Sequence, residues 1–175
     1  MKKILIYAVV LQFLFVFALF TVPLFLDKEY HVRETVEIQA SPDKVRARLM
    51  DFKQWREWHA YSRKVNVFNR LRLSKKTAGP GAKLEWDSPG GYDGVLTIKK
   101  YTNSGLHYTS TFEKESFRAR GSITWRREGK LTVVEWTESG TPRLYVTRIA
   151  NFLFAARISK DLVAGLDALK DVCER

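Results

Sequence analysis

The sequence predicts an α+β protein in which one antiparallel sheet and a long C-terminal helix follow a single transmembrane helix. Three observations carry this prediction. Residues 4–26 form an apolar run without a charged side chain, and segments of strand length then follow one another between turn residues over positions 64–139. From Tyr145 onward, the spacing of apolar residues changes to the helical period of about 3.6.

The apolar run divides the chain into an N-terminal transmembrane anchor, residues 1–28, and a folded domain, residues 29–175. At roughly 1.5 Å per residue, residues 4–26 would form a helix of about 34 Å, slightly longer than a bilayer's hydrocarbon core is thick. A cleaved signal peptide has a shorter apolar core and a small-residue cleavage site, which this run does not match. Lys2 and Lys3 precede the run, so the positive-inside rule places the domain on the periplasmic or extracytoplasmic side of the inner (cytoplasmic) membrane.

Composition restricts the chemistry of the domain. The formal net charge of +11 suits either a soluble surface or contact with anionic phospholipid headgroups, and both interpretations stay open. Cys173 is the one cysteine, so an intramolecular disulfide is excluded. The histidines His31, His59 and His107 lack metal-ligand spacing, and we expect no metal and no cofactor. The extracytoplasmic placement disfavours nucleic acid as a partner.

The domain begins with a strand and two short helices. Residues 30–39 alternate apolar and polar side chains and predict a half-buried strand, with Glu34 as the exception on its apolar side. Ser41 and Pro42 are typical of a helix start. Residues 51–58 predict a second short helix or turn that brings Trp55 and Trp58 close together.

A series of strands and one long helix complete the domain. The strand candidates are residues 64–73, 82–86, 94–101, 106–113, 117–127 and 131–139, with turn residues such as Gly79, Pro80 and Gly81 between them. Short connections without intervening helices predict an antiparallel meander. The helix from Tyr145 onward contains no proline, and an interruption near Ser159 is expected.

The order of these segments carries a resemblance to a known family. The segments concerned are residues 38–45 (IQASPDKV), Asp51 with Trp55 and Trp58, residues 79–82 (GPGA) with Trp86, and residues 94–98 (GVLTI), 132–136 (TVVEW) and 165–170 (GLDALK). The chain resembles the START-like helix-grip (SRPBCC) superfamily, in its bacterial polyketide cyclase/dehydrase and lipid transport branch. The resemblance implies a curved sheet of about seven strands wrapped around the C-terminal helix, with a cavity that commonly takes an apolar ligand.

Aromatic and histidine side chains near the expected cavity are the candidate ligand contacts. They are Trp55, Trp58, His59, Tyr61, Trp86, Tyr108, Phe112, Trp125, Trp136 and Phe152. Each could instead be an ordinary core residue, because aromatic side chains dominate protein cores whatever the function. Their joint number favours a roomy apolar interior.

Glu135 and His59 are weak candidates for acid–base chemistry. Glu135 shares a strand face with Leu131 and Val133, and a carboxyl in an apolar interior would have a raised pKa. The opposite face, with Trp136, is also apolar, so the inward face stays open and Glu135 could be a salt-bridged surface carboxylate. The sequence contains no nucleophile elbow, phosphate-binding glycine loop or metal spacing, and catalysis is not favoured.

The first functional hypothesis is a membrane-anchored domain that binds a lipid or another hydrophobic small molecule close to the bilayer. The lipid bilayer would be contacted through residues 4–26. Two alternatives stay open. One is an accessory or scaffold subunit of a larger membrane protein complex, and the other is a cyclase- or hydrolase-type enzyme, because fold alone does not determine function.

Overall fold

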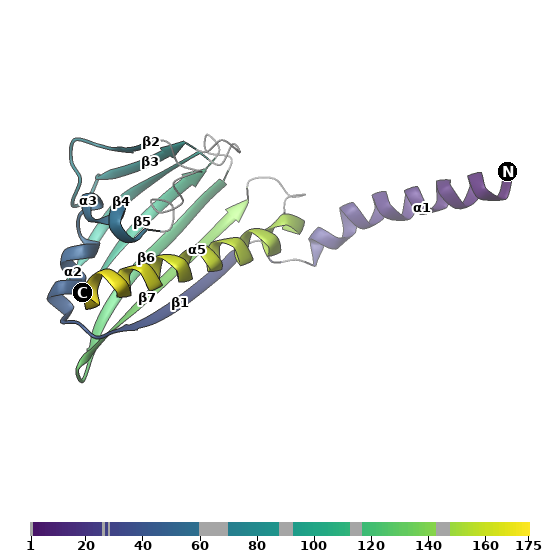
Figure 1. Ribbon diagram of the computed structural model, residues 1–175. Helices are drawn as coiled ribbons and strands as arrows, with labels where there is room; N and C mark the ends of the chain where they lie inside the picture. The colour runs from purple at the N-terminus through teal and green to yellow at the C-terminus, as the bar shows by residue number, and fades with distance from the viewer. Residues whose placement is uncertain are drawn as a thin grey trace.

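An antiparallel sheet holds the long C-terminal helix, α5, against one of its faces, which we call the inner face (Figure 1). The computed structural model describes residues 2–25, 27, 29–59, 70–87, 93–112, 117–142 and 148–175. Within these residues the sheet has seven strands in the order β1-β7-β6-β5-β4-β3-β2. The α+β class, the antiparallel meander and the closing helix are therefore confirmed.

The elements follow the predicted order along the chain. The helices are α1 (Lys2–Thr21), η1 (Val22–Leu24), α2 (Pro42–Leu49), α3 (Phe52–Trp58) and α5 (Arg148–Glu174). The strands are β1 (Tyr30–Ile38), β2 (Arg70–Leu73), β3 (Lys83–Asp87), β4 (Gly94–Thr102), β5 (Gly105–Phe112), β6 (Phe117–Glu128) and β7 (Leu131–Pro142). The strand predicted over residues 64–73 is described only from Arg70 onward, where it is β2.

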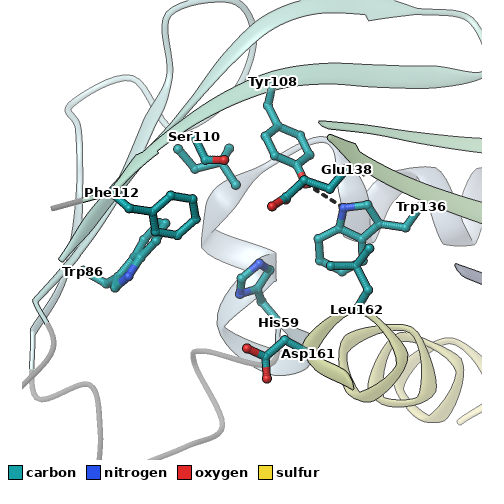
Figure 2. A pocket seen from close by; sticks show the side chains of 10 residues that line it. His59, Trp86, Tyr108, Ser110, Phe112, Trp136, Glu138, Asp161 and Leu162 are labelled. Carbon is teal, nitrogen blue, oxygen red and sulfur yellow. Dashed lines mark hydrogen bonds between the residues drawn. The ribbon is translucent and has the colours of Figure 1, made fainter. Parts of the chain in front are cut away.

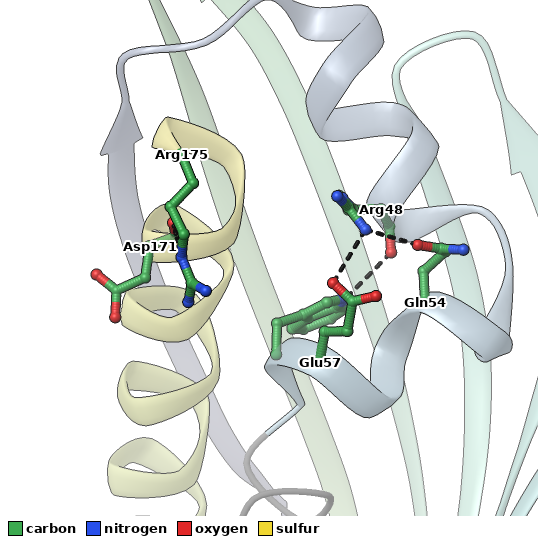
Figure 3. A network of polar contacts seen from close by, with 6 residues as sticks. Arg48, Gln54, Glu57, Asp171 and Arg175 are labelled. Carbon is green, nitrogen blue, oxygen red and sulfur yellow. Dashed lines mark hydrogen bonds and ion pairs between the residues drawn. The ribbon is translucent and has the colours of Figure 1, made fainter.

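Helices α2 and α3 lie between β1 and β2 along the chain, and side-chain hydrogen bonds fix their positions. The Arg48 guanidinium donates to Gln54 Oε1 at 2.7 Å and to Glu57 Oε2 at 3.0 Å, which ties the two helices together (Figure 3). The indole N–H groups of Trp55 and Trp58 donate to the backbone carbonyls of Leu49 and Arg48. Both tryptophans are fully buried, so this short connection forms part of the core.

Helix α5 runs without a break past Ser159, so the predicted interruption is wrong. The Ser159 hydroxyl donates to Glu34 Oε1 at 2.6 Å. This bond also explains why a carboxylate occupies the apolar side of β1, because it satisfies a partly buried polar group. The pair joins the helix to the first strand of the sheet.

The inward face of the late strands is resolved by burial. On β7, Val134, Trp136 and Glu138 are buried, whereas Glu135 and Thr137 between them are partly exposed. Successive side chains of a strand point to opposite faces. Trp136 and Glu138 therefore point toward α5, and Glu135 points to the outer face.

Helix α1 extends away from the sheet, at the end of the domain where α5 begins (Figure 1). Its apolar side chains are exposed; Leu11 and Phe13, for example, are each 70 % exposed. Among the described residues, no helix has both the length and the apolar character needed to span a membrane. The structure does not support the transmembrane span over residues 4–26, which stays a prediction.

Candidate functional site

A small pocket lies between the inner face of the sheet and α5 (Figure 2). Its volume is about 20 Å³, which is room for one water-sized group. The described residues that line it are His59, Trp86, Leu96, Tyr108, Ser110, Phe112, Trp136, Glu138, Asp161 and Leu162. The predicted roomy interior is therefore not what the described residues show, because large aromatic side chains fill the space under the sheet.

Glu138 lies at the centre of a buried hydrogen-bond network. The Tyr30 hydroxyl donates to its Oε1 at 2.8 Å, and the Tyr108 hydroxyl donates to its Oε2 at 2.7 Å. The Trp136 indole N–H in turn donates to the Tyr108 oxygen at 2.7 Å. Burial raises the pKa of Glu138 above its ordinary value, and this effect outweighs the two tyrosine hydrogen bonds, which lower it.

Two glycines make room for the aromatic walls of the pocket. A Cβ atom on Gly121 would lie 2.0 Å from Tyr108 Cζ, and one on Gly94 would lie 2.0 Å from Trp86 Cζ2. Both distances are far below van der Waals contact. The glycines therefore allow the Tyr108 and Trp86 rings to lie flat against the neighbouring strands, which places the Tyr108 hydroxyl within reach of Glu138.

His59 follows α3 and is buried among indole rings. It stacks on Trp55 with a centroid separation of 5.1 Å, and the ring of Trp136 lies 5.6 Å away. Burial lowers the pKa of His59 from 6.5 to about 3. The imidazole is therefore neutral at physiological pH and offers the pocket one donor and one acceptor nitrogen.

Ser110 and Asp161 complete the polar part of the wall. Ser110 is 2 % exposed, and its hydroxyl has no hydrogen-bond partner among the described residues. Asp161, on α5, is 6 % exposed, and its negative charge contributes to the raised pKa of Glu138. The pocket thus combines aromatic rings with two buried carboxyl groups and a hydroxyl that has no protein partner in the described part of the chain.

The structure brings together half of the predicted ligand contacts. His59, Trp86, Tyr108, Phe112 and Trp136 line the pocket. Trp55 and Trp58 pack behind it in the core, and Trp125 is buried elsewhere on β6. Tyr61 and the side chain of Phe152 lie outside the described residues.

Glu135, the weak catalytic candidate, lies on the outer face, 3.8 Å from the Arg33 guanidinium. This is the salt-bridged surface position that the sequence left open as an alternative. Sequence analysis missed Glu138, Ser110 and Asp161. Glu138 could have been found from its spacing, because it is two residues from Trp136 and so shares its strand face.

Comparisons with known proteins agree with this fold. A family model described as polyketide cyclase / dehydrase and lipid transport matches residues 29–174. No curated protein matches the sequence. Among solved structures, the di-domain ARO/CYC protein StfQ from the steffimycin biosynthetic pathway has a TM-score of 0.64 at 12% identity, covering 83% of this chain and 51% of that chain.

Two further structures cover more of their own chains. A hypothetical protein from Helicobacter pylori has a TM-score of 0.62 at 12% identity, with 82% of this chain and 88% of that chain covered. Norcoclaurine synthase from Thalictrum flavum, solved with dopamine and hydroxybenzaldehyde, has a TM-score of 0.58 at 15% identity, with 82% and 86% covered. At these identities the likeness concerns the fold alone.

The buried neutral imidazole predicts a loss of stability in acid. Because the pKa of His59 is 6.5 when unfolded and about 3 when folded, the folded state resists protonation. Stability is retained above pH 6.5 and falls as the pH drops toward 3, by about 1.4 kcal/mol per pH unit for this group. Acid unfolding followed by tryptophan fluorescence should show that His59→Phe reduces this dependence.

The matched control is His107→Phe, because His107 is exposed on β5 and does not line the pocket. This variant should retain the acid-induced loss seen in the unmodified protein. An unchanged acid dependence in His59→Phe would show that another group is responsible.

Proposed function

Because the chain belongs to the polyketide cyclase / dehydrase and lipid transport family, we propose that it binds a hydrophobic small molecule between the sheet and α5. The observation that carries this proposal is the buried hydroxyl of Ser110, which has no hydrogen-bond partner among the described residues and lies in a wall of aromatic rings. Ligand pockets are predominantly apolar with a few convergent polar groups that fix orientation. The combination of Trp86, Phe112 and Trp136 with Ser110 and Glu138 is of this kind.

Binding requires side chains to move. Pockets for small molecules typically measure about 300–1,000 Å³, whereas this one measures about 20 Å³. We place the movement at Trp86 and Phe112, whose rings lie edge to face with centroids 5.6 Å apart at the ends of β3 and β5. Their displacement would lengthen the cavity while the Glu138 network stays in place.

The proposal also places the domain beside a membrane. Two observations support this placement, namely the uncharged run of residues 4–26 and the exposed apolar side chains of α1. Tyr30 begins β1 four residues after Leu26 and donates to Glu138, so at most about 14 Å of chain separates the end of the run from the pocket network. A hydrophobic ligand could then exchange with the bilayer directly.

An enzyme is the second candidate, because the pocket contains titratable groups with shifted pKa values. Burial raises the pKa of Glu138 and lowers that of His59, and such pairs occur at acid–base sites. Glu138 takes the place that the sequence analysis gave to Glu135. The chemistry would be a proton transfer on a ligand held beside Tyr108.

Native mass spectrometry of the full chain, extracted in mild detergent, tests ligand binding. The unmodified protein should carry an added mass of small-molecule size. Ser110→Leu should lose that mass, because the larger side chain fills the cavity beside Tyr108. Thr109→Leu, the neighbouring residue on the outer face, is the matched control and should retain it.

The outcome that contradicts the proposal is an unmodified protein that carries no small molecule and, once delipidated, takes up no apolar probe. A bound partner polypeptide without a small molecule would move the assignment to an accessory subunit.

Alkaline extraction of membranes tests the anchor. The unmodified chain should remain in the membrane pellet, whereas Leu11→Arg combined with Leu14→Arg should release it, because each change costs about 3 kcal/mol of insertion free energy. Val163→Arg, at an exposed apolar residue of α5, is the control and should stay in the pellet. Recovery of the unmodified chain in the soluble fraction would refute membrane anchorage. A topology reporter fused to the C-terminus tests the proposed extracytoplasmic side.

A further inference from the structure

We infer that the ligand of this pocket carries a protonated amine, held between Glu138 and the surrounding aromatic rings. The inference rests on the proposed function and names the chemistry of the molecule bound. It combines three independent features of the described residues, namely the charge of the pocket wall, the aromatic rings around it and the unpartnered hydroxyl of Ser110.

The charge of the wall favours a cation. Two of its described residues, Glu138 and Asp161, are acidic, and none is a lysine or an arginine. His59 is neutral in its buried position. Where the pH is high enough to ionise Glu138, an anionic head group, such as the carboxylate of a fatty acid, would lie next to a second carboxylate, and no lysine or arginine of the described wall would compensate the two charges. Like charges at short range repel strongly in a buried site.

The aromatic rings favour the same charge. Trp86, Tyr108, Phe112 and Trp136 surround the cavity. The face of an aromatic ring attracts a cation, and the attraction is strongest for tryptophan and for desolvated sites. Rings together with a carboxylate form the usual surroundings of a bound organic ammonium group.

The hydrogen-bonding groups have free capacity for an ammonium group. An ionised carboxylate has about four acceptor positions, and Tyr30 and Tyr108 use one on each oxygen of Glu138. The Ser110 hydroxyl, buried and unpartnered among the described residues, is a further acceptor in the same wall (Figure 2). An ammonium group has three donors and is about the size of a water molecule, which the cavity of about 20 Å³ accommodates.

The test compares three probes that share one ring and differ in head group: phenethylamine, phenethyl alcohol and phenylacetate. The full chain is labelled with fluorotryptophan, and binding is followed by fluorine NMR. The chain has five tryptophans, and each signal is assigned from its Trp→Phe variant. The signals of Trp86 and Trp136 should shift on binding, whereas that of Trp125, outside the pocket lining, is the internal reference.

The amine should bind at least about tenfold more tightly than the alcohol, and phenylacetate should bind most weakly. Glu138→Gln should abolish the preference for the amine, because it removes the negative charge and keeps the shape of the side chain. Glu135→Gln, on the same strand but the outer face, is the matched control and should retain the preference. Ser110→Ala should weaken the binding of the amine. This variant is expected to fold normally, because the Ser110 hydroxyl makes no hydrogen bond to the described residues.

The results separate this inference from the proposed function. If the alcohol or phenylacetate shifts the Trp86 and Trp136 signals and binds as tightly as the amine or more tightly, the inference of an amine ligand is wrong. The proposed function, binding of a hydrophobic small molecule, would still stand. An amine that shifts no pocket signal would also overturn the inference of an amine ligand. If Glu138→Gln does not fold, Ser110→Ala serves as the test instead. A Ser110→Ala variant that binds the amine as tightly as the unmodified chain would contradict the proposed geometry.

Discussion

The structure depends on one buried carboxyl group, that of Glu138, which receives hydrogen bonds from Tyr30 and Tyr108. The three residues come from β7, β1 and β5, so the network joins strands that are far apart in the sequence. A buried polar group without partners costs about 1–3 kcal/mol, and the tyrosine hydroxyls offset only part of the cost of burying Glu138, because its pKa stays raised. Trp136 extends the network to the tryptophans of α3, and Gly121 allows Tyr108 to lie where it reaches the carboxyl. The site and the core are therefore the same set of residues.

Most of the fold could be predicted from the sequence, because it follows from local patterns. The alternation in β1, the cap at Ser41 and the helical period of α5 each depend on neighbouring residues only. The interruption expected near Ser159 is absent from α5. The sequence pattern did not reveal the hydrogen-bond partner that accommodates this polar residue in the helix. Glu34, which Ser159 contacts, lies far away in the sequence.

The site was predictable only in part, because it depends on contacts between residues that lie far apart in the sequence. Aromatic residues such as Trp86 and Trp136 were found because their size predicts burial. Glu135 was the acid–base candidate and Glu138 was not considered, because apolar residues on both faces of β7 leave its inward face undecided in the sequence. The burial of Trp136 and Glu138 beneath α5 decides it. The size of the pocket could not be predicted from the sequence, because the pocket size depends on how the aromatic rings pack. That packing leaves room for a water-sized group and makes any larger ligand dependent on side-chain movement.

Glu138 is a buried, tyrosine-bonded carboxyl whose pKa is raised by burial above the ordinary 4.5. Infrared difference spectroscopy between the unmodified full chain and Glu138→Gln measures this group directly. A carbonyl band from a protonated carboxylic acid should persist above pH 4.5 in the unmodified chain and should be missing from the variant. A band that disappears at the pH at which exposed glutamates ionise, or one that Glu138→Gln leaves unchanged, would contradict this prediction.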